Sequence, residues 1–249
     1  MNILTLDFLR SFWSIPEVGV NVVIFMNLLG ALLLGLVVGY ERSYHGRAAG
    51  MRTYALVCTA SAGLVVLCGF PSFWYGGHVV VSAGADPTRV IQGIVTGIGF
   101  LGAGVIMKEG FSISGLTTAA SIWSSSAIGV LVGVGFYGAA MLLTLLSVTC
   151  MMWVSRLEGW LPTRHAVQVA MRFRRGFVPR EEQLRRSALT RGYEIALGTL
   201  TIDFKNEQAE WSFVAVALGK DRGAPLSRLA GELTDFEGVE SYHLAHARN

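Results

Sequence analysis

Residues 93–129 read GIVTGIGFLGAGVIMKEGFSISGLTTAASIWSSSAIG and decide the class of fold. Two apolar arms flank a short polar turn at residues 108–110. The first arm is crowded with small residues, which are Gly93, Gly97, Gly99, Gly102, Ala103 and Gly104. Each glycine costs a water-exposed helix about 0.8–1 kcal/mol, whereas in lipid small residues let helix backbones approach closely. The stretch therefore predicts membrane-spanning helices, with Gly93 and Gly97 forming a close-packing pair.

The second arm carries a stripe of hydroxyl groups from Thr117, Ser121, Ser124 and Ser125. Their spacing places all four on one face of a helix. In a membrane, such a face is expected to contact other helices or a water-filled cavity. The alternative is that each hydroxyl bonds back to a carbonyl of its own helix.

Composition supports a membrane domain followed by a soluble one. The chain of 249 residues is 52% hydrophobic, and its mean hydropathy is +0.51, which is typical of a membrane protein. Residues 1–160 hold 7 Lys/Arg and 6 Asp/Glu, and residues 161–249 hold the other 13 and 11. We therefore predict a transmembrane domain over 1–160 and a soluble domain over 161–249, with the boundary near residues 160–162. The net charge of +3 shows no nucleic-acid footprint.

No chemistry-bearing cluster stands out. Cys58, Cys68 and Cys150 lie in apolar runs without a CxxC or Cys/His pattern, so we expect no metal site. Cys58 and Cys68 are ten residues apart on one predicted helix, about 15 Å, which is too far for a disulfide. The sequence has neither a nucleophile–base pair nor a phosphate-binding loop. We therefore expect no catalytic residues, no cofactor and no enzymatic activity.

Hydropathy predicts five spans of roughly the ~20 residues that a bilayer needs. They cover residues 20–40, 53–69, 90–107, 115–133 and 136–155. Gly35 and Gly39 form a second close-packing pair, and the last two spans should form a tight hairpin. Residues 1–19 either lie along the membrane interface or form a loose terminus, and the interfacial side chains would be Phe8, Leu9, Phe12 and Trp13.

The loop charges predict the orientation. Five spans place the termini on opposite sides of the membrane. One side carries five basic residues, Arg42, Arg47, Arg52, Lys108 and Arg156, and the other side carries Arg10 and Arg89. The positive-inside rule places the first group in the cytoplasm. The N-terminus is then periplasmic and the soluble domain cytoplasmic.

Two loops carry charged candidates for a site. Glu41 closes the first span and should pair with a neighbouring guanidinium, because a lone carboxylate near the acyl chains is costly. Asp86 precedes Pro87 and is placed to cap the next helix. In an alternative interpretation, Asp86 and Arg89 form the outer mouth of a transport path.

The soluble part predicts a small α+β domain. Alternating residues indicate strands at 165–175, 193–204, 208–218 and 239–247, and helices are indicated at 179–191 and 225–236. The order βαββαβ is the ferredoxin-like pattern. Many functions use this fold, so the order alone does not identify a ligand.

Five separated motifs resemble the MgtC/SapB family of bacterial inner-membrane proteins, in family order. They are GYER at 39–42, AGMRT at 49–53, DPTR at 86–89, GIGFLGAGVI at 97–106, and GLTTAA at 115–120 continuing through Trp123. The C-terminal part looks like the ACT-like domain of the longer members. The sequence differs from some relatives at Thr117, where they carry Asn, and at Ser124, where they carry Cys.

The resemblance implies adaptation to low magnesium and, in pathogens, survival inside host cells. It implies a regulatory role rather than magnesium transport, with the F-type ATP synthase as a proposed membrane partner. On this hypothesis the third span docks the partner in the bilayer, and Glu41, Arg42, Arg47 and Arg52 form its cytoplasmic rim. We expect Gly97 to pack inside the bundle and Gly102 to face the partner; an oligomer would satisfy both roles.

The alternative function is a transporter or channel lined by the hydroxyl stripe that includes Ser121 and Ser124. Against it, no acidic residue falls in the middle of a span, although a magnesium path would be expected to have some. Five spans also do not divide evenly into an inverted repeat.

Overall fold

The computed structural model describes residues 10–78, 86–109, 112–154, 156–157, 164–219 and 224–246. The chain divides into two compact units, one of residues 1–107 and 115–155 and the other of residues 108–114 and 156–249. We describe each unit by itself. Phe8, Leu9, Gly110 and the predicted boundary at residues 160–162 lie outside the described residues.

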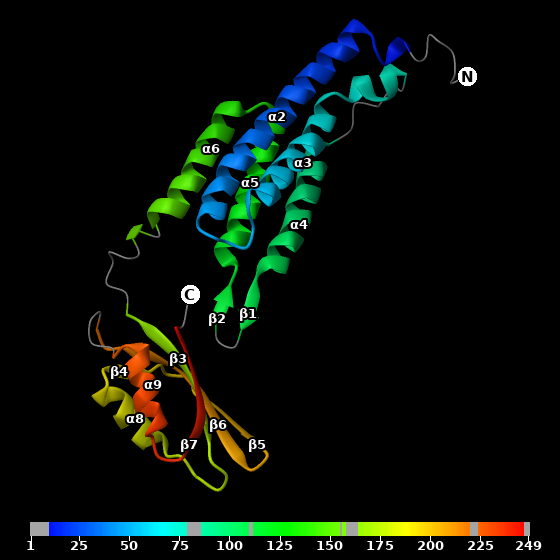
Figure 1. The fold of residues 1–249 in the computed structure, drawn as a ribbon. Helices are drawn as coiled ribbons and strands as arrows, with labels where there is room; N and C mark the ends of the chain where they lie inside the picture. Colours follow the sequence, from blue (N-terminus) through cyan, green and yellow to red (C-terminus); the bar gives the residue numbers. More distant parts are fainter. Residues whose placement is uncertain are drawn as a thin grey trace. The chain divides into compact units, whose positions relative to one another are not determined.

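The first unit is a bundle of five long apolar helices within the described part of the chain (Figure 1). They are α2 (Ile15–Tyr44), α3 (Met51–Gly69), α4 (Pro87–Val105), α5 (Leu116–Val134) and α6 (Tyr137–Thr149), the last extended by the π-helical turn Cys150–Val154. Each is long and apolar enough to cross a bilayer, so the five predicted spans are confirmed. A 3-10 segment (Pro71–Gly77) follows α3, and the hairpin β1 (Met107–Glu109) and β2 (Ser112–Ser114) joins α4 to α5.

The first span begins earlier than predicted. The predicted start is residue 20, but α2 starts at Ile15 and has 30 residues, about 45 Å at 1.5 Å per residue. Ser14 caps it by accepting a hydrogen bond from the Glu17 N–H, and Pro16 opens the first turn, where its missing N–H is harmless. Of the predicted interfacial side chains, Phe12 and Trp13 are exposed.

Close approaches of the backbone hold α2, α3 and α5 together. A Cβ at Gly35 would lie 2.8 Å from the Cα of Ala55, and one at Gly39 would lie 2.5 Å from the Cα of Met51. The predicted pair Gly35 and Gly39 therefore does pack tightly, against α3. Gly133 of α5 packs against α3 in the same way. A Cβ at Gly133 would lie 2.8 Å from the carbonyl oxygen of Ala62. Helix α5 contacts all four other helices, so it is the centre of the bundle.

The turn between α5 and α6 is the predicted tight hairpin. Gly135 adopts φ +92°, which glycine takes without steric cost, and its N–H bonds to the carbonyls of Leu131 and Val132. Such an end satisfies carbonyl groups that the helix leaves without partners.

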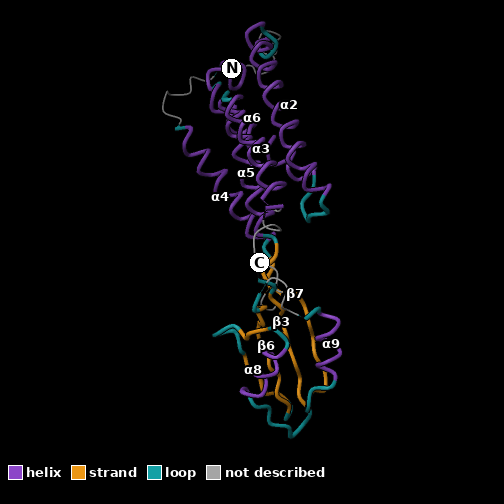
Figure 2. Tube along the Cα trace, turned by 90° about the vertical axis from the view of Figure 1, so that its left-hand side faces the viewer, coloured by secondary structure: helices purple, strands orange, loops and turns teal. Residues whose placement is uncertain are grey.

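The second unit is a sheet covered on one face by two helices (Figures 1 and 2). Its elements are β3 (Ala166–Phe173), α8 (Glu181–Thr190), β4 (Tyr193–Ile195), β5 (Thr201–Lys205), β6 (Gln208–Ala217), α9 (Leu226–Thr234) and β7 (Val239–His246). The strand order is β4-β6-β3-β7, with β5 also paired to β6 and every pair antiparallel. This is the predicted ferredoxin-like order, except that the second predicted strand is divided into β4 and β5.

Alternation along β3 and β6 builds the core of this unit. Val169 lies opposite Phe213 on β6 and Leu244 on β7. The inward residues pack with Leu184 of α8 and Leu229 of α9 in one buried cluster. Burial on alternate positions is what a sheet with one covered face requires.

Candidate functional site

A pair of charged residues is buried where α2 ends, at the end of the bundle where α3 and α5 begin. We call this the basic end, because Arg42, Arg47 and Arg52 lie there. Glu41 is 6% exposed and Arg42 is 4% exposed. Their side chains approach at 3.9 Å, between Glu41 Oε2 and Arg42 Nη1, so the predicted pairing of Glu41 with a guanidinium is confirmed. Each charge compensates the other in a place where a single one would be costly.

Three further groups contact this pair. The half-exposed His45 lies with Nδ1 3.1 Å from Glu41 Oε1. Arg42 Nη2 donates to Thr118 Oγ1 on α5 at 3.2 Å, and Arg42 Nη1 donates weakly to Met151 Sδ at 3.7 Å. Within the described residues, Glu41 Oε2 and Arg42 Nε have no hydrogen-bond partner. The guanidinium therefore links three helical segments while one of its donors stays free.

The other basic side chains of the predicted rim lie apart from this buried pair. Arg47 is exposed in the loop after α2, and Arg52 is exposed in the first turn of α3. Neither forms an ion pair within the described residues. The four predicted rim residues thus separate into a buried pair and two solvent-facing cations.

The hydroxyl groups of α5 tie this helix to its neighbours. Ser121 Oγ donates to the carbonyl of Thr118 at 2.9 Å and accepts from the Tyr54 hydroxyl at 2.6 Å. Ser125 donates to the Tyr54 carbonyl at 3.0 Å, and Ser124 bonds Ser147 of α6 at 2.6 Å. Both interpretations of the stripe hold in part, because Ser121 bonds its own helix as well as α3.

Thr117 and Trp123 of this arm point away from the bundle interior. Thr117 is exposed, and the inward threonine is its neighbour Thr118, 5% exposed. Trp123 is 50% exposed. Nothing in the sequence favours Thr118 over Thr117, and no pattern singles out Tyr54 or Met151.

The structure reverses the predicted roles of Gly97 and Gly102. Gly102 is buried, and a Cβ there would lie 3.6 Å from the Cβ of Ala119 on α5. At Gly97, and equally at Gly93, Gly99 and Gly104, a Cβ would have no described atom within 4 Å. The pair Gly93 and Gly97 therefore does not pack inside its own bundle, and α4 instead buries Ile94, Ile98 and Gly102.

Asp86 caps α4 as predicted. Its Oδ1 accepts from the Thr88 hydroxyl at 2.6 Å and from the Thr88 N–H at 2.9 Å. These two bonds hold the pKa of the Asp86 carboxyl below its ordinary value. Arg89 is exposed in the same turn. The capping role explains why an aspartate stands at position 86, so a transport path is not needed to explain it.

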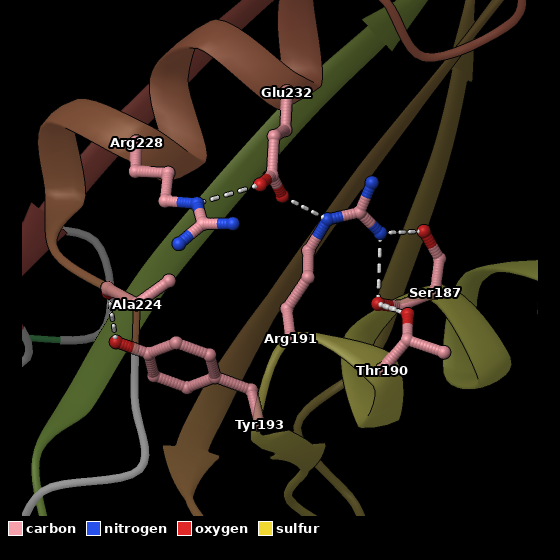
Figure 3. A network of polar contacts seen from close by, with 7 residues as sticks. All are labelled: Ser187, Thr190, Arg191, Tyr193, Ala224, Arg228 and Glu232. Atoms are coloured by element: carbon pink, nitrogen blue, oxygen red, sulfur yellow. Dashed lines mark hydrogen bonds and ion pairs between the residues drawn. The ribbon is translucent and has the colours of Figure 1, made fainter.

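The sheet unit holds a second polar cluster, between α8 and α9 (Figure 3). Arg191 follows α8 and reaches across to Glu232 of α9, which also pairs with Arg228 at 3.2 Å. Arg191 Nη1 also donates to the carbonyl of Ser187 at 2.8 Å. The hydrogen bond from Arg191, with smaller contributions from the charges and from Arg228, keeps the pKa of Glu232 below its ordinary value. The cluster borders an apolar cavity of ≈ 50 Å³ between the helices and the sheet, lined by Leu184, Ala188 and Leu233 among others.

The described residues hold neither a cluster of candidate metal ligands nor a disulfide. No group of three His, Cys, Asp or Glu side chains that could hold a metal ion occurs among them. Cys58, Cys68 and Cys150 are all free thiols.

The fold and the buried site define a multi-pass membrane protein with a small α+β domain after its fifth helix. The profile of the MgtC family matches residues 28–160, which is more than half of the chain. The chain therefore belongs to the MgtC family, and the matched region contains Glu41, Arg42 and Thr118.

Two relatives illustrate the similarity. The chain is 49% identical over 117 residues to Protein MgtC of Brucella abortus (strain 2308). The matched region covers 47% of this chain and 45% of the relative. The chain is 43% identical over 121 residues to Protein MgtC of Salmonella typhimurium (strain 14028s), covering 49% of this chain and 48% of the relative. The chain thus spans about half the length of the curated relatives it matches. No solved structure matches it.

Proposed function

We propose that this protein is a regulatory inner-membrane protein of the MgtC type that acts by binding another membrane protein. Family membership supports a role in adaptation to low magnesium and, in a pathogen, in survival inside host cells. The F-type ATP synthase is the candidate partner that the resemblance implies. The proposed role is one of binding rather than catalysis, and we assign the sheet unit as ACT-like from its βαββαβ order.

The observation that carries this proposal is the open face of α4, defined by Gly93, Thr96, Gly97, Phe100 and Gly104. Gly35 and Gly39 of α2 and Gly133 of α5 are explained by atoms of α3 that lie close to them. Gly93, Gly97 and Gly104 share one face of α4, and apart from its own helix backbone no described atom lies within 4 Å of a Cβ at any of them; Gly19 and Gly30 of α2 are open in the same way. Glycine lowers helix stability and is favoured in membranes where another helix comes close. A partner helix would supply that close approach.

Comparison with α6 separates a docking face from a lipid face. Both helices are little buried, but the exposed side chains of α6 are large and apolar, as lipid contact favours: Met141, Leu142, Leu145 and Leu146. The open face of α4 presents glycines and Thr96, whose hydroxyl donates to the Gln92 carbonyl of its own helix at 2.9 Å, with Phe100 as its one large side chain, 83% exposed. Helices α3 and α4 border a groove of ≈ 590 Å³. It is lined by Gly93 and Gly97 of the open face and by Leu56 and Leu64 of α3, among others. A second helix fits this face better than lipid does.

The loop charges support an orientation with the N-terminus in the periplasm and the sheet unit in the cytoplasm. Ion transport is the less favoured function. Ser121, Ser124 and Ser125, which were candidates to line a path, are engaged in bonds between helices.

Three leucine substitutions test the proposal with a matched control. Gly97→Leu alters the open face, Gly102→Leu alters the contact with Ala119, and Gly138→Leu alters an equally open glycine on α6. We expect Gly102→Leu to lower the amount of folded protein. Gly97→Leu should fold normally but fail to support growth in low magnesium, and Gly138→Leu should behave as wild type. Normal growth of the Gly97→Leu strain, or equal loss of function in Gly138→Leu, would contradict a docking role for this face.

A further inference from the structure

The guanidinium of Arg42 has two edges that face different surroundings. Nη1 points to Glu41 Oε2 at 3.9 Å and to Met151 Sδ at 3.7 Å. Nε and Nη2 share the opposite edge, the one that binds carboxylates and phosphates through two parallel hydrogen bonds. On this edge Nη2 donates to Thr118 Oγ1 at 3.2 Å, and Nε has no partner in the described part of the chain. The edge is therefore half used, in a side chain only 4% exposed.

This edge contacts the first turn of α5, whose own N–H groups lack hydrogen-bond acceptors within the helix. Helix α5 starts after Gly115, which gives no side-chain cap, and its first turn contains no acidic residue. As at the start of any α-helix, the first N–H groups of α5, from Leu116 to Thr118, have no acceptor within the helix itself. The N-terminus of a helix carries about half a positive charge. The Nε/Nη2 edge of Arg42 thus lies against a positive helix end, while Glu41 is 3.9 Å away on the Nη1 side. An anion at this edge would face both the guanidinium and the helix end.

We propose that Arg42, Thr118 and the first turn of α5 bind a phosphate group. Nε and Nη2 would hold two of its oxygens, and the N–H groups of Leu116 and Thr117 would hold a third. Glu41 lies on the Nη1 side, so it keeps Arg42 oriented without occupying the binding edge. The positive charge of Arg42 would compensate negative charge on the phosphate, as guanidinium groups commonly do.

The position of the site indicates where the phosphate comes from. Leu116 is 52% exposed and Thr117 is exposed, so the turn is open to its surroundings although Arg42 is not. The site lies at the ends of α2 and α5, the depth at which a bilayer presents lipid headgroups. Arg47 and Arg52 at the same end would attract anionic lipid. A lipid phosphate and a soluble phosphate share this chemistry, and the experiment separates them.

The test uses the full chain purified in a neutral maltoside detergent. Phosphatidylglycerol is added in one series and inorganic phosphate in another, and the thermal unfolding midpoint and native mass spectrum are recorded. Arg42→Lys keeps the charge but removes the Nε/Nη2 edge, and Thr118→Val removes the hydroxyl with little change of shape. Arg47→Gln is the matched control, since it removes an exposed charge from the same end.

We expect phosphatidylglycerol to raise the midpoint of the wild-type and Arg47→Gln proteins. In Arg42→Lys and Thr118→Val, binding should weaken about tenfold or more. An effect of inorganic phosphate alone, with the same dependence on Arg42 and Thr118, would support the site and assign a soluble ligand. If Arg42→Lys does not fold, Thr118→Val decides. Equal binding by wild type and Thr118→Val, a loss confined to Arg47→Gln, or no effect of either ligand would overturn the proposal. The open face of α4 plays no part in this result.

Discussion

Tyr54 of α3 and Ser121 of α5 are joined hydroxyl to hydroxyl at 2.6 Å, and Ser125 one turn further on donates to the Tyr54 carbonyl at 3.0 Å. Two bonds to one residue fix the rotation of α5 about its axis. That rotation turns Thr118 inward to Arg42 and leaves Thr117 exposed. A contact in the middle of the bundle thus determines which side chain meets the buried charge at its end.

Replacing Tyr54 by Phe removes this hydroxyl pair and should destabilise the bundle modestly. Hydrogen bonds between membrane helices contribute about 0.6 kcal/mol on average, so we expect a small fall in the unfolding midpoint of the detergent-solubilised protein. Tyr44→Phe is the control, because Tyr44 is 76% exposed. If the two variants unfolded alike, the Tyr54–Ser121 bond would not be what sets the rotation of α5.

Glu41→Ala leaves Arg42 buried without its counter-charge. Breaking a buried pair in this way typically costs about 3–5 kcal/mol, so we expect a large loss of thermal stability and of function. The double variant Glu41→Gln/Arg42→Met removes both charges and should recover much of the stability. Thermal unfolding of both proteins measures this difference. A Glu41→Ala protein as stable as wild type would show that the pair is not a compensated ion pair.

Acid should loosen the contact between α8 and α9. The pKa of Glu232 is lowered in the folded protein, so its contribution to stability is present above the ordinary glutamate pKa and is lost as the pH falls through the lowered folded value. We expect the unfolding midpoint of the sheet unit to fall in this acidic range, and Glu232→Gln to weaken that dependence. Glu194→Gln is the control, an exposed residue that forms no ion pair among the described residues. Identical pH profiles for wild type and Glu232→Gln would count against the cluster.

The orientation of the chain is tested with reporters. A reporter fused after Asn249 should be active only if it is a form that works in the cytoplasm, because five spans and the basic loops place the C-terminus inside. The comparison is a reporter that works only in the periplasm, fused at the same position. Activity of the periplasmic form would refute the predicted orientation.

Sequence patterns predicted the features that depend on residues close to one another in the chain. Hydropathy located the spans, Asp86 before Pro87 predicted the cap, and alternation in residues 165–218 predicted the sheet. The predicted start of α2, at residue 20, is wrong because it leaves out the first turn, which Ser14 caps and where Pro16 is favoured. The division of the second strand around Gly198 was also not predicted; this residue adopts φ +80°.

The faces of the membrane helices could not be predicted in the same way. Helix α4 carries two neighbouring stripes, one of Gly93, Gly97 and Gly104 and the other of Ile94, Ile98 and Gly102. In a water-soluble protein the larger apolar residues of a helix would face the core. In a membrane, apolar side chains can face either lipid or protein, and small residues allow any close contact between helices. The choice depends on the shape of α5, where Ala119 accommodates Gly102. Nothing within α4 itself carries that information.

The central claim, that the open face of α4 binds another membrane protein, is tested most directly by photo-crosslinking in living cells. A photoreactive phenylalanine analogue is placed at Phe100 on this face, or at Leu145, which is 63% exposed on the apolar face of α6. We predict that position 100 traps one defined membrane protein, that Gly97→Leu abolishes this product, and that position 145 traps none. Products of equal yield at both positions, no product at position 100, or a product that survives Gly97→Leu would contradict the account.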